Sequence, residues 1–144
     1  MSYRPVFLTA KWHNLFFANY VVQPTLVKNL VPRGTSLDNW NGRIFISLVA
    51  FQFLDTKILG VPVFSQRNFD EVNLRFYVNR TVEKVEKRGV VFIREIVPSP
   101  IIAWVANRLY GENYTARKMQ SKMTRINGQV DRLEYRIMNE GRWN

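Results

Sequence analysis

The sequence predicts an α+β fold in which one mainly antiparallel sheet carries two short helices. The stretch Val72–Val78 alternates strictly between apolar and polar side chains, which is the period of a β-strand with one apolar face. The longest apolar stretch, Arg43–Asp55, is rich in β-branched and aromatic residues and lacks helical periodicity, so it predicts a core strand covered on both faces. A charged connection, Thr81–Gly89, leads to a second apolar stretch, Gly89–Val97, as expected for antiparallel neighbours.

The segments before and between these strands complete the N-terminal half. Trp12–Val22 is aromatic and β-branched, which predicts a further strand with a bulge near Asn14. Gln23–Pro32 predicts a short helix, because its first proline suits the first helical turn and its last prevents continuation. The loop Leu59–Ser65 is unusually apolar, so we expect it to pack over the mouth of a cavity.

The C-terminal part begins with a helix signal. Ser99 suits the N-cap of a helix, Pro100 its first position, and Gly111 its end. Residues 114–124 and 130–138 then predict two strands on either side of an Asn-Gly turn.

Composition narrows the class of protein. The 144 residues, 47% hydrophobic and 14% aromatic, suffice for a globular core, so residues 1–144 are expected to form a single domain. Cysteine is absent, which excludes disulfides, thiolate metal sites and cysteine nucleophiles, and we expect no metal and no cofactor. No apolar run reaches the roughly 18 residues of a membrane span, and no signal peptide is visible. A cytoplasmic protein without a membrane partner is therefore expected.

The net charge of +10, from 21 basic and 11 acidic side chains, is high for this length. Residues 1–66 hold six basic and two acidic groups, residues 67–107 seven and five, and residues 108–144 eight and four. Because the excess is spread along the chain, it predicts a generally basic solvated surface. A nucleic-acid partner stays open as the alternative that this charge permits.

The polar face of the Val72–Val78 strand supplies the first candidate ligand-binding residues. Asn73, Arg75 and Tyr77 offer an amide, a guanidinium and a phenol, which can hydrogen-bond planar or anionic groups. A strand whose polar face is simply solvated would show the same pattern, so both interpretations stay open.

Other candidates lie on the neighbouring segments. Arg94 and Glu95 interrupt an apolar strand in succession, so one of them faces the interior and requires a partner, for which Glu71 or Arg75 is the nearest choice. Glu71 is also the first candidate general acid or base if burial raises its pKa. The sole histidine, His13, is the second candidate, although a structural role suits a lone histidine better.

Several segments carry a family resemblance. They are residues 67–78, which read Arg-Asn-Phe-Asp-Glu-Val-Asn-Leu-Arg-Phe-Tyr-Val, with residues 89–95, 103–114, 30–35 and 42–56. Together they resemble the YqjF-like domain-of-unknown-function family of the acetoacetate decarboxylase-like superfamily. The resemblance implies a curved antiparallel sheet that forms a cone or partial barrel around an interior pocket.

The chain departs from the decarboxylases at the residues that perform their chemistry. In those enzymes a desolvated lysine forms a Schiff base with the keto acid. Ile93-Arg94-Glu95 resembles the segment before this lysine, which places the lysine position at or near Ile101 and Ile102. The pocket arginine of the family corresponds to Leu15, whereas Glu71 matches a pocket glutamate. The resemblance therefore implies a pocket without Schiff-base lysine chemistry.

The chain also looks short at its C-terminus relative to this family, as if truncated before the last strands of the cone. An unpaired sheet edge invites pairing, so we expect a homo-oligomer, a dimer, whose interface covers that edge. The leading functional interpretation is a protein that binds a small anionic organic molecule, with catalysis left undecided. The alternatives are a basic nucleic-acid-binding module and a structural remnant without a ligand.

Overall fold

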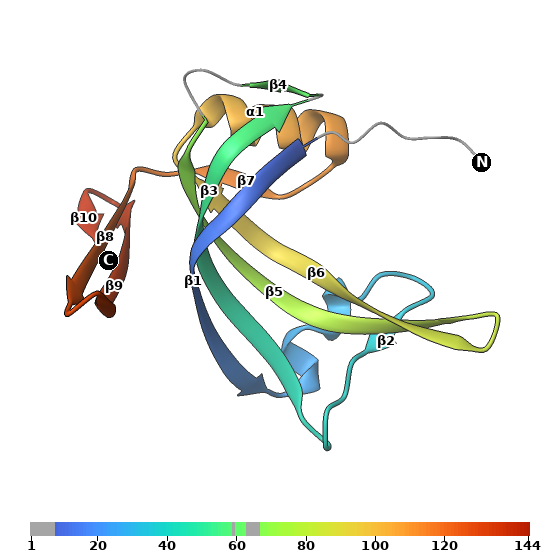
Figure 1. Ribbon diagram of the computed structural model, residues 1–144. Helices are drawn as coiled ribbons and strands as arrows, with labels where there is room; N and C mark the ends of the chain where they lie inside the picture. The colour runs from blue at the N-terminus through green and yellow to red at the C-terminus, as the bar shows by residue number, and fades with distance from the viewer. Residues whose placement is uncertain (1–7, 59, 63–66) are drawn as a thin grey trace.

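The computed structural model describes residues 8–58, 60–62 and 67–144 (Figure 1). In chain order its elements are β1 (Leu8–Val22), the 3-10 turns η1 (Pro24–Leu26) and η2 (Lys28–Leu30), β2 (Ser36–Leu37), β3 (Ile44–Ile58), β4 (Val61–Pro62), β5 (Phe69–Val82), β6 (Val85–Val97), α1 (Pro100–Tyr110), β7 (Tyr114–Ala116), β8 (Met119–Ile126), β9 (Gln129–Asn139) and β10 (Arg142–Trp143). A seven-stranded sheet holds β1 to β7, and a three-stranded sheet holds β8 to β10.

The large sheet is curved and open. Its main strands follow the order β1-β3-β5-β6-β7, with β2 paired to β5 and β4 to β3. All pairs are antiparallel except β6 and β7, which are parallel because α1 crosses over between them. Among the described residues, β1 and β7 end the order without pairing to each other, so the expected cone is a curved layer and not a closed barrel (Figure 1).

The long strands confirm the patterns that predicted them. β3 lies between β1 and β5 and extends the predicted strand to Ile58. β1 has the predicted bulge, since its register shifts between His13 and Phe16 and Asn14 has a φ of 52°. The charged connection is shorter than predicted, because β5 and β6 continue to a two-residue turn at Glu83 and Lys84, both with positive φ.

The first predicted helix is wrong in type, since Gln23–Pro32 forms two 3-10 turns and leaves α1 as the one α-helix among the described residues. An α-helix has a costly first turn and is rarely stable over so few residues. Two tight turns instead bring Val27 into the core, where it is almost fully buried.

The second helix confirms its sequence signals. The Ser99 hydroxyl accepts a hydrogen bond from the backbone N–H of Ile102 at 3.2 Å, which caps the first turn. Gly111 adopts a φ of 68° and donates its N–H to the Asn107 carbonyl at 3.2 Å, which ends the helix.

Two hydrophobic cores pack against opposite faces of the large sheet. The core beneath α1 consists of Val49, Phe51, Phe53, Phe69, Val97 and Ala103. The core beneath the 3-10 turns consists of Val27, Ile44, Phe76 and Val78. Side chains alternate along a strand, so odd-numbered residues of β5 from Phe69 to Tyr77 share the side that α1 covers at one end. We call this side the α1 face.

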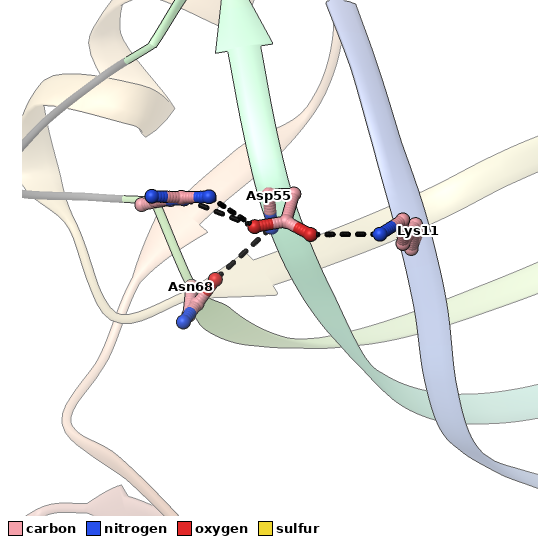
Figure 2. Close-up of polar contacts among 4 residues, drawn as sticks. Lys11, Asp55 and Asn68 are labelled. Carbon is pink, nitrogen blue, oxygen red and sulfur yellow. Dashed lines mark hydrogen bonds and ion pairs between the residues drawn. The ribbon is translucent and has the colours of Figure 1, made fainter.

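A polar cluster at Asp55 anchors the start of β5 (Figure 2). Asp55, at a φ of 56°, accepts hydrogen bonds from Lys11 Nζ at 2.9 Å and from Arg67 Nη2 at 2.6 Å, and its backbone N–H donates to Asn68 Oδ1 at 3.0 Å. The cluster ties β1 and β3 to the residues that enter β5. It therefore supports the register that places the polar side chains of β5.

The segment around β4 was predicted as the apolar loop Leu59–Ser65. Val61 and Pro62 pair with β3, and the rest of the prediction falls largely outside the described residues.

The C-terminal region differs from its prediction in one respect. The predicted strand at residues 114–124 is two strands, because β7 joins the large sheet and β8 pairs with β9 around the predicted turn at Asn127 and Gly128. The β8–β9 hairpin contacts the face opposite α1 through Ser121, which hydrogen-bonds Gln52 at 2.9 Å. Within the described ranges, no helix has the length and apolar character needed to cross a membrane.

Candidate functional site

Five polar side chains lie together on the α1 face. Glu71, Asn73, Arg75 and Tyr77 follow one another on β5, and Glu95 of β6 lies directly opposite Asn73. We call these five residues the polar row. Glu71 is 3% exposed, Asn73 2% and Glu95 3%, so this part of the strand face is not solvated. A fully solvated polar face is therefore excluded for this part of the strand, whereas ligand binding by these residues stays a prediction.

Glu71 and Asn73 are buried because β5 lies in the middle of the sheet, with apolar neighbours beside them. On the β3 side, Phe51 faces Glu71 and Val49 faces Asn73. Both apolar partners belong to the core beneath α1 and replace water around the carboxyl and the amide. Polar groups placed in such surroundings are costly unless they are hydrogen-bonded or neutral.

Glu71 and Glu95 form a pair of buried acids. The Glu71 carboxyl accepts a hydrogen bond from Asn73 Nδ2 at 3.1 Å and another from the Tyr114 hydroxyl at 3.3 Å. Burial raises the pKa of Glu71 to about 7, although these hydrogen bonds oppose the shift. Burial, followed by the neighbouring charge of Glu71, raises the pKa of Glu95 to about 7 as well. Each of the two carboxyls can therefore gain or lose a proton near neutral pH.

Tyr114 of β7 lies beside the two acids and hydrogen-bonds Glu71. Burial, followed by the charges of both carboxyls, raises the pKa of its phenol above the ordinary value. The phenol consequently stays protonated at neutral pH and acts as a hydrogen-bond donor.

Arg75 is the cation of the polar row. Its guanidinium carbon lies 4.9 Å from the ring centre of Phe17 on β1 and 5.9 Å from that of Tyr77. Its Nε is buried and makes no hydrogen bond within the described part of the chain. Arg75 thus lies close to two aromatic rings and has donor capacity unused.

Beyond Arg75 the face continues into a small hydrogen-bonded group. The Ser47 hydroxyl donates to Asn19 Oδ1 at 2.5 Å, and its oxygen lies 2.6 Å from the Tyr77 hydroxyl. Because Ser47 has one hydroxyl proton and gives it to Asn19, the Tyr77 hydroxyl donates to Ser47.

A hollow of about 250 Å³ lies at this end of the polar row. Its lining residues come from five segments of the chain and are Asn19, Asp38, Trp40, Phe45, Tyr77 and Arg88. The Asp38 carboxylate and the Arg88 guanidinium form an ion pair at 3.5 Å within this lining.

Two predicted site residues lie elsewhere. Arg94 is exposed on the face opposite the polar row, so only Glu95 of the consecutive pair points inward. His13 is exposed and faces Gln52, also away from Glu71. Of the two partners left open for the inward residue, Glu71 is the neighbour whose charge acts on Glu95.

Tyr114, Ser47 and Asn19 were missed by sequence reasoning. Tyr114 had a usable signal, because a strand that follows a helix tends to return parallel to the strand before that helix. Ser47 and Asn19 lie in strongly apolar strands, where a lone small polar residue has no pattern of its own. Across the described residues, no group of three acidic or histidine side chains is arranged to hold a metal ion.

Comparisons with known proteins identify the family of this chain. The family model DUF2071, described as an uncharacterized conserved protein, matches residues 9–143. The chain belongs to this family. It is 35% identical to the uncharacterized protein YqjF of Bacillus subtilis over 68 residues, which cover 46% of this chain and 28% of YqjF. The family resemblance predicted from the sequence is therefore confirmed.

A solved structure supports the fold. The crystal structure of acetoacetate decarboxylase from Legionella pneumophila matches with a TM-score of 0.69 at 12% identity, over 99% of this chain and 49% of that one. The chain thus has an acetoacetate decarboxylase-like fold and spans about half the length of that enzyme.

Proposed function

We propose that the polar row binds a small organic carboxylate, with Arg75 as its anchor and Glu71 and Glu95 as proton-exchanging groups beside it. The observation that supports this most strongly is the set of buried polar atoms without partners. Four such side-chain atoms occur among the described residues, and three of them, Asn73 Oδ1, Arg75 Nε and Glu95 Oε2, belong to the polar row. Buried polar atoms are nearly always satisfied, so their concentration in one row suggests a ligand.

The chemistry of each side chain sets its proposed role. The Arg75 guanidinium offers planar donors that match a carboxylate, and the rings of Phe17 and Tyr77 hold it in place. The Asn73 carbonyl can accept a hydrogen bond from a hydroxyl or enol of the ligand. Protonated Glu71 and Glu95 can donate to a carbonyl oxygen, and each can take the proton back after deprotonation.

The proposed site uses no Schiff base, because none of its members is a lysine. A lysine-dependent reaction needs a neutral amine next to the substrate carbonyl. Two carboxyls that titrate near pH 7 suit a different role, namely proton transfer to and from a carbon acid or its enol.

A thermal-shift screen tests this proposal. The pure protein is heated with short keto acids, hydroxy acids, fatty acids and sugar acids, and separately with a short oligonucleotide. A ligand that binds only the folded state raises the melting temperature. We expect a shift with one class of acid and none with the oligonucleotide.

The decisive comparison is Arg75→Ala against Arg80→Ala. Both arginines lie on β5, but Arg80 is exposed and outside the polar row. Loss of a charge-assisted pair should weaken acid binding at least about tenfold in Arg75→Ala and leave Arg80→Ala unchanged. Acid binding that survives Arg75→Ala would refute the anchor. A salt-sensitive shift with the oligonucleotide alone would instead favour nucleic-acid binding by the basic surface.

A further inference from the structure

The hollow beside Tyr77 has an aromatic lining, of which the proposed carboxylate site uses only Tyr77. Trp40, Phe45 and Tyr77 contribute rings from a turn, from β3 and from β5 respectively. The Trp40 and Phe45 ring centres are 6.1 Å apart and their planes are tilted by 57°. Trp40 remains 59% exposed, so a large part of its ring has no partner in the described chain.

A tight turn holds Trp40 in position. Trp40 and Arg43 exchange two backbone hydrogen bonds, each of 3.0 Å, around Asn41 and Gly42, which both have positive φ. The Asn39 side chain also accepts the Gly42 N–H at 2.7 Å. Because the turn is already ordered, covering the Trp40 ring costs little conformational entropy.

The polar part of the lining favours an uncharged occupant. The Asp38 carboxylate is neutralised by Arg88 at 3.5 Å. These two side chains are already paired with each other, so neither is free to pair with a charged group of a ligand. A planar ring suits the aromatic lining better, because it can stack on or meet the edges of these rings.

The hollow adjoins the carboxylate anchor. The Tyr77 ring lines the hollow and also lies 5.9 Å from the Arg75 guanidinium carbon. Residues two apart on one strand face are separated by about 7 Å, so a single short acid can reach from the Arg75 guanidinium to the hollow. The volume of about 250 Å³ is below the range of pockets that enclose a whole drug-sized ligand, so the hollow suits one part of a molecule.

We infer that the ligand is an arylalkyl carboxylate, whose carboxylate binds Arg75 and whose ring occupies the hollow between Trp40, Phe45 and Tyr77. This inference rests on the proposed carboxylate site and adds the class of molecule that the site selects. The ring then covers the exposed part of Trp40, and the short linker passes the Ser47 and Tyr77 hydroxyls.

Calorimetric titration with phenylpropanoate and propanoate tests the inference, since the two acids differ only by the ring. Phenylpropanoate should bind about tenfold more tightly to the natural protein. Trp40→Ala should remove this advantage without changing propanoate binding, and Trp40→Phe should restore most of it. Trp104→Ala is the matched control, because Trp104 is 66% exposed on α1, outside the hollow. Circular dichroism checks that each variant is folded.

The outcomes separate the two proposals. If propanoate binding depends on Arg75 but the phenyl group adds nothing, or adds the same in Trp40→Ala, the aryl inference is overturned and the carboxylate site stands. If neither acid binds the natural protein at millimolar concentration, both proposals fail together.

Discussion

The Tyr114 hydroxyl donates a hydrogen bond to Glu71 Oε2 over 3.3 Å, which joins β7 to β5 across the intervening strand β6. The parallel return after α1 places Tyr114 beside Glu95, its register partner on β6. One phenol thereby contacts the acid pair from the end of the sheet that α1 covers. The crossover through α1 therefore positions Tyr114 at the site.

Tyr114→Phe should raise the pKa of both acids above about 7. The phenol lowers the pKa of Glu71 and of Glu95 by hydrogen bonding. Without it, burial raises both pKa values further. The pH at which stability changes should move upward. Tyr135→Phe is the control, because its hydroxyl donates to the Asn14 carbonyl at 2.7 Å, outside the polar row. An unchanged midpoint in Tyr114→Phe would argue against the proposed role of the phenol.

Glu71 should make the protein less stable as the pH rises from about 5 to about 8. Its pKa is 4.5 in an ordinary environment and about 7 in the folded protein, so in this window the folded chain keeps a proton that the unfolded chain releases. The contribution of Glu71 to stability is complete below pH 4.5 and decreases until the pH has passed about 7. At ~1.4 kcal/mol per pKa unit, Glu71 alone accounts for roughly 3 kcal/mol.

Urea denaturation of Glu71→Gln across this pH range measures that contribution. The variant should show a flatter profile and a gain in stability at the alkaline end. Glu86→Gln is the control, since Glu86 is exposed near the tip of the β5–β6 hairpin. Equal slopes in the natural protein and Glu71→Gln would contradict a raised pKa at this position.

Asp55 should have the opposite pH dependence. Hydrogen bonds from Lys11 and Arg67 hold its pKa below the ordinary 3.8, so its contribution is present above that value and disappears as the pH falls through the lowered one. Asp55→Asn keeps a residue that tolerates the positive φ and should lower the melting temperature slightly at neutral pH. High salt should shrink the difference because the group is exposed. A difference independent of both salt and pH would mean that backbone geometry, and not charge, is responsible.

We propose that the edge of β1 pairs with the same edge of a second copy. Among the described residues β1 ends the large sheet, and Phe16, Tyr20 and Val21 on it are exposed. Residues 12–22 contain no charged side chain in a chain of net charge +10, so two copies of this strand can approach without like-charge repulsion.

Light scattering at micromolar concentration tests the β1 interface. The natural protein should have the mass of a dimer, and Phe16→Lys should have that of a monomer. Val130→Lys, at a similarly exposed site on β9, should remain dimeric. A monomeric natural protein would refute the interface.

Patterns among neighbouring residues predicted those elements whose formation depends on neighbouring residues. The alternation of β5, the cap at Ser99 and the bulge at Asn14 each depend on neighbouring residues, and all three are confirmed. The 3-10 turns were misjudged because proline spacing marks where a helix can begin and end but not which helix forms.

The site depended on contacts that no local pattern contains. Alternation identified the polar row on β5, but the burial of Glu71 follows from its central strand and from α1 packing across the same face. The position of Glu95 opposite Asn73 and near Glu71 follows from the β5–β6 register. Trp40 was not singled out, since it approaches Phe45 and Tyr77 only through folding.

A carbon NMR titration of the glutamate carboxyls, with and without pyruvate, tests directly whether the polar row holds two raised acids beside a carboxylate site. We expect two carboxyls, those of Glu71 and Glu95, to titrate with midpoints near pH 7. Pyruvate bound to Arg75 should move both midpoints upward, because a nearby anion favours the neutral acids, and Arg75→Ala should abolish that movement. If every glutamate titrates near its ordinary value of 4.5 and pyruvate changes none of them, the polar row is not a carboxylate site.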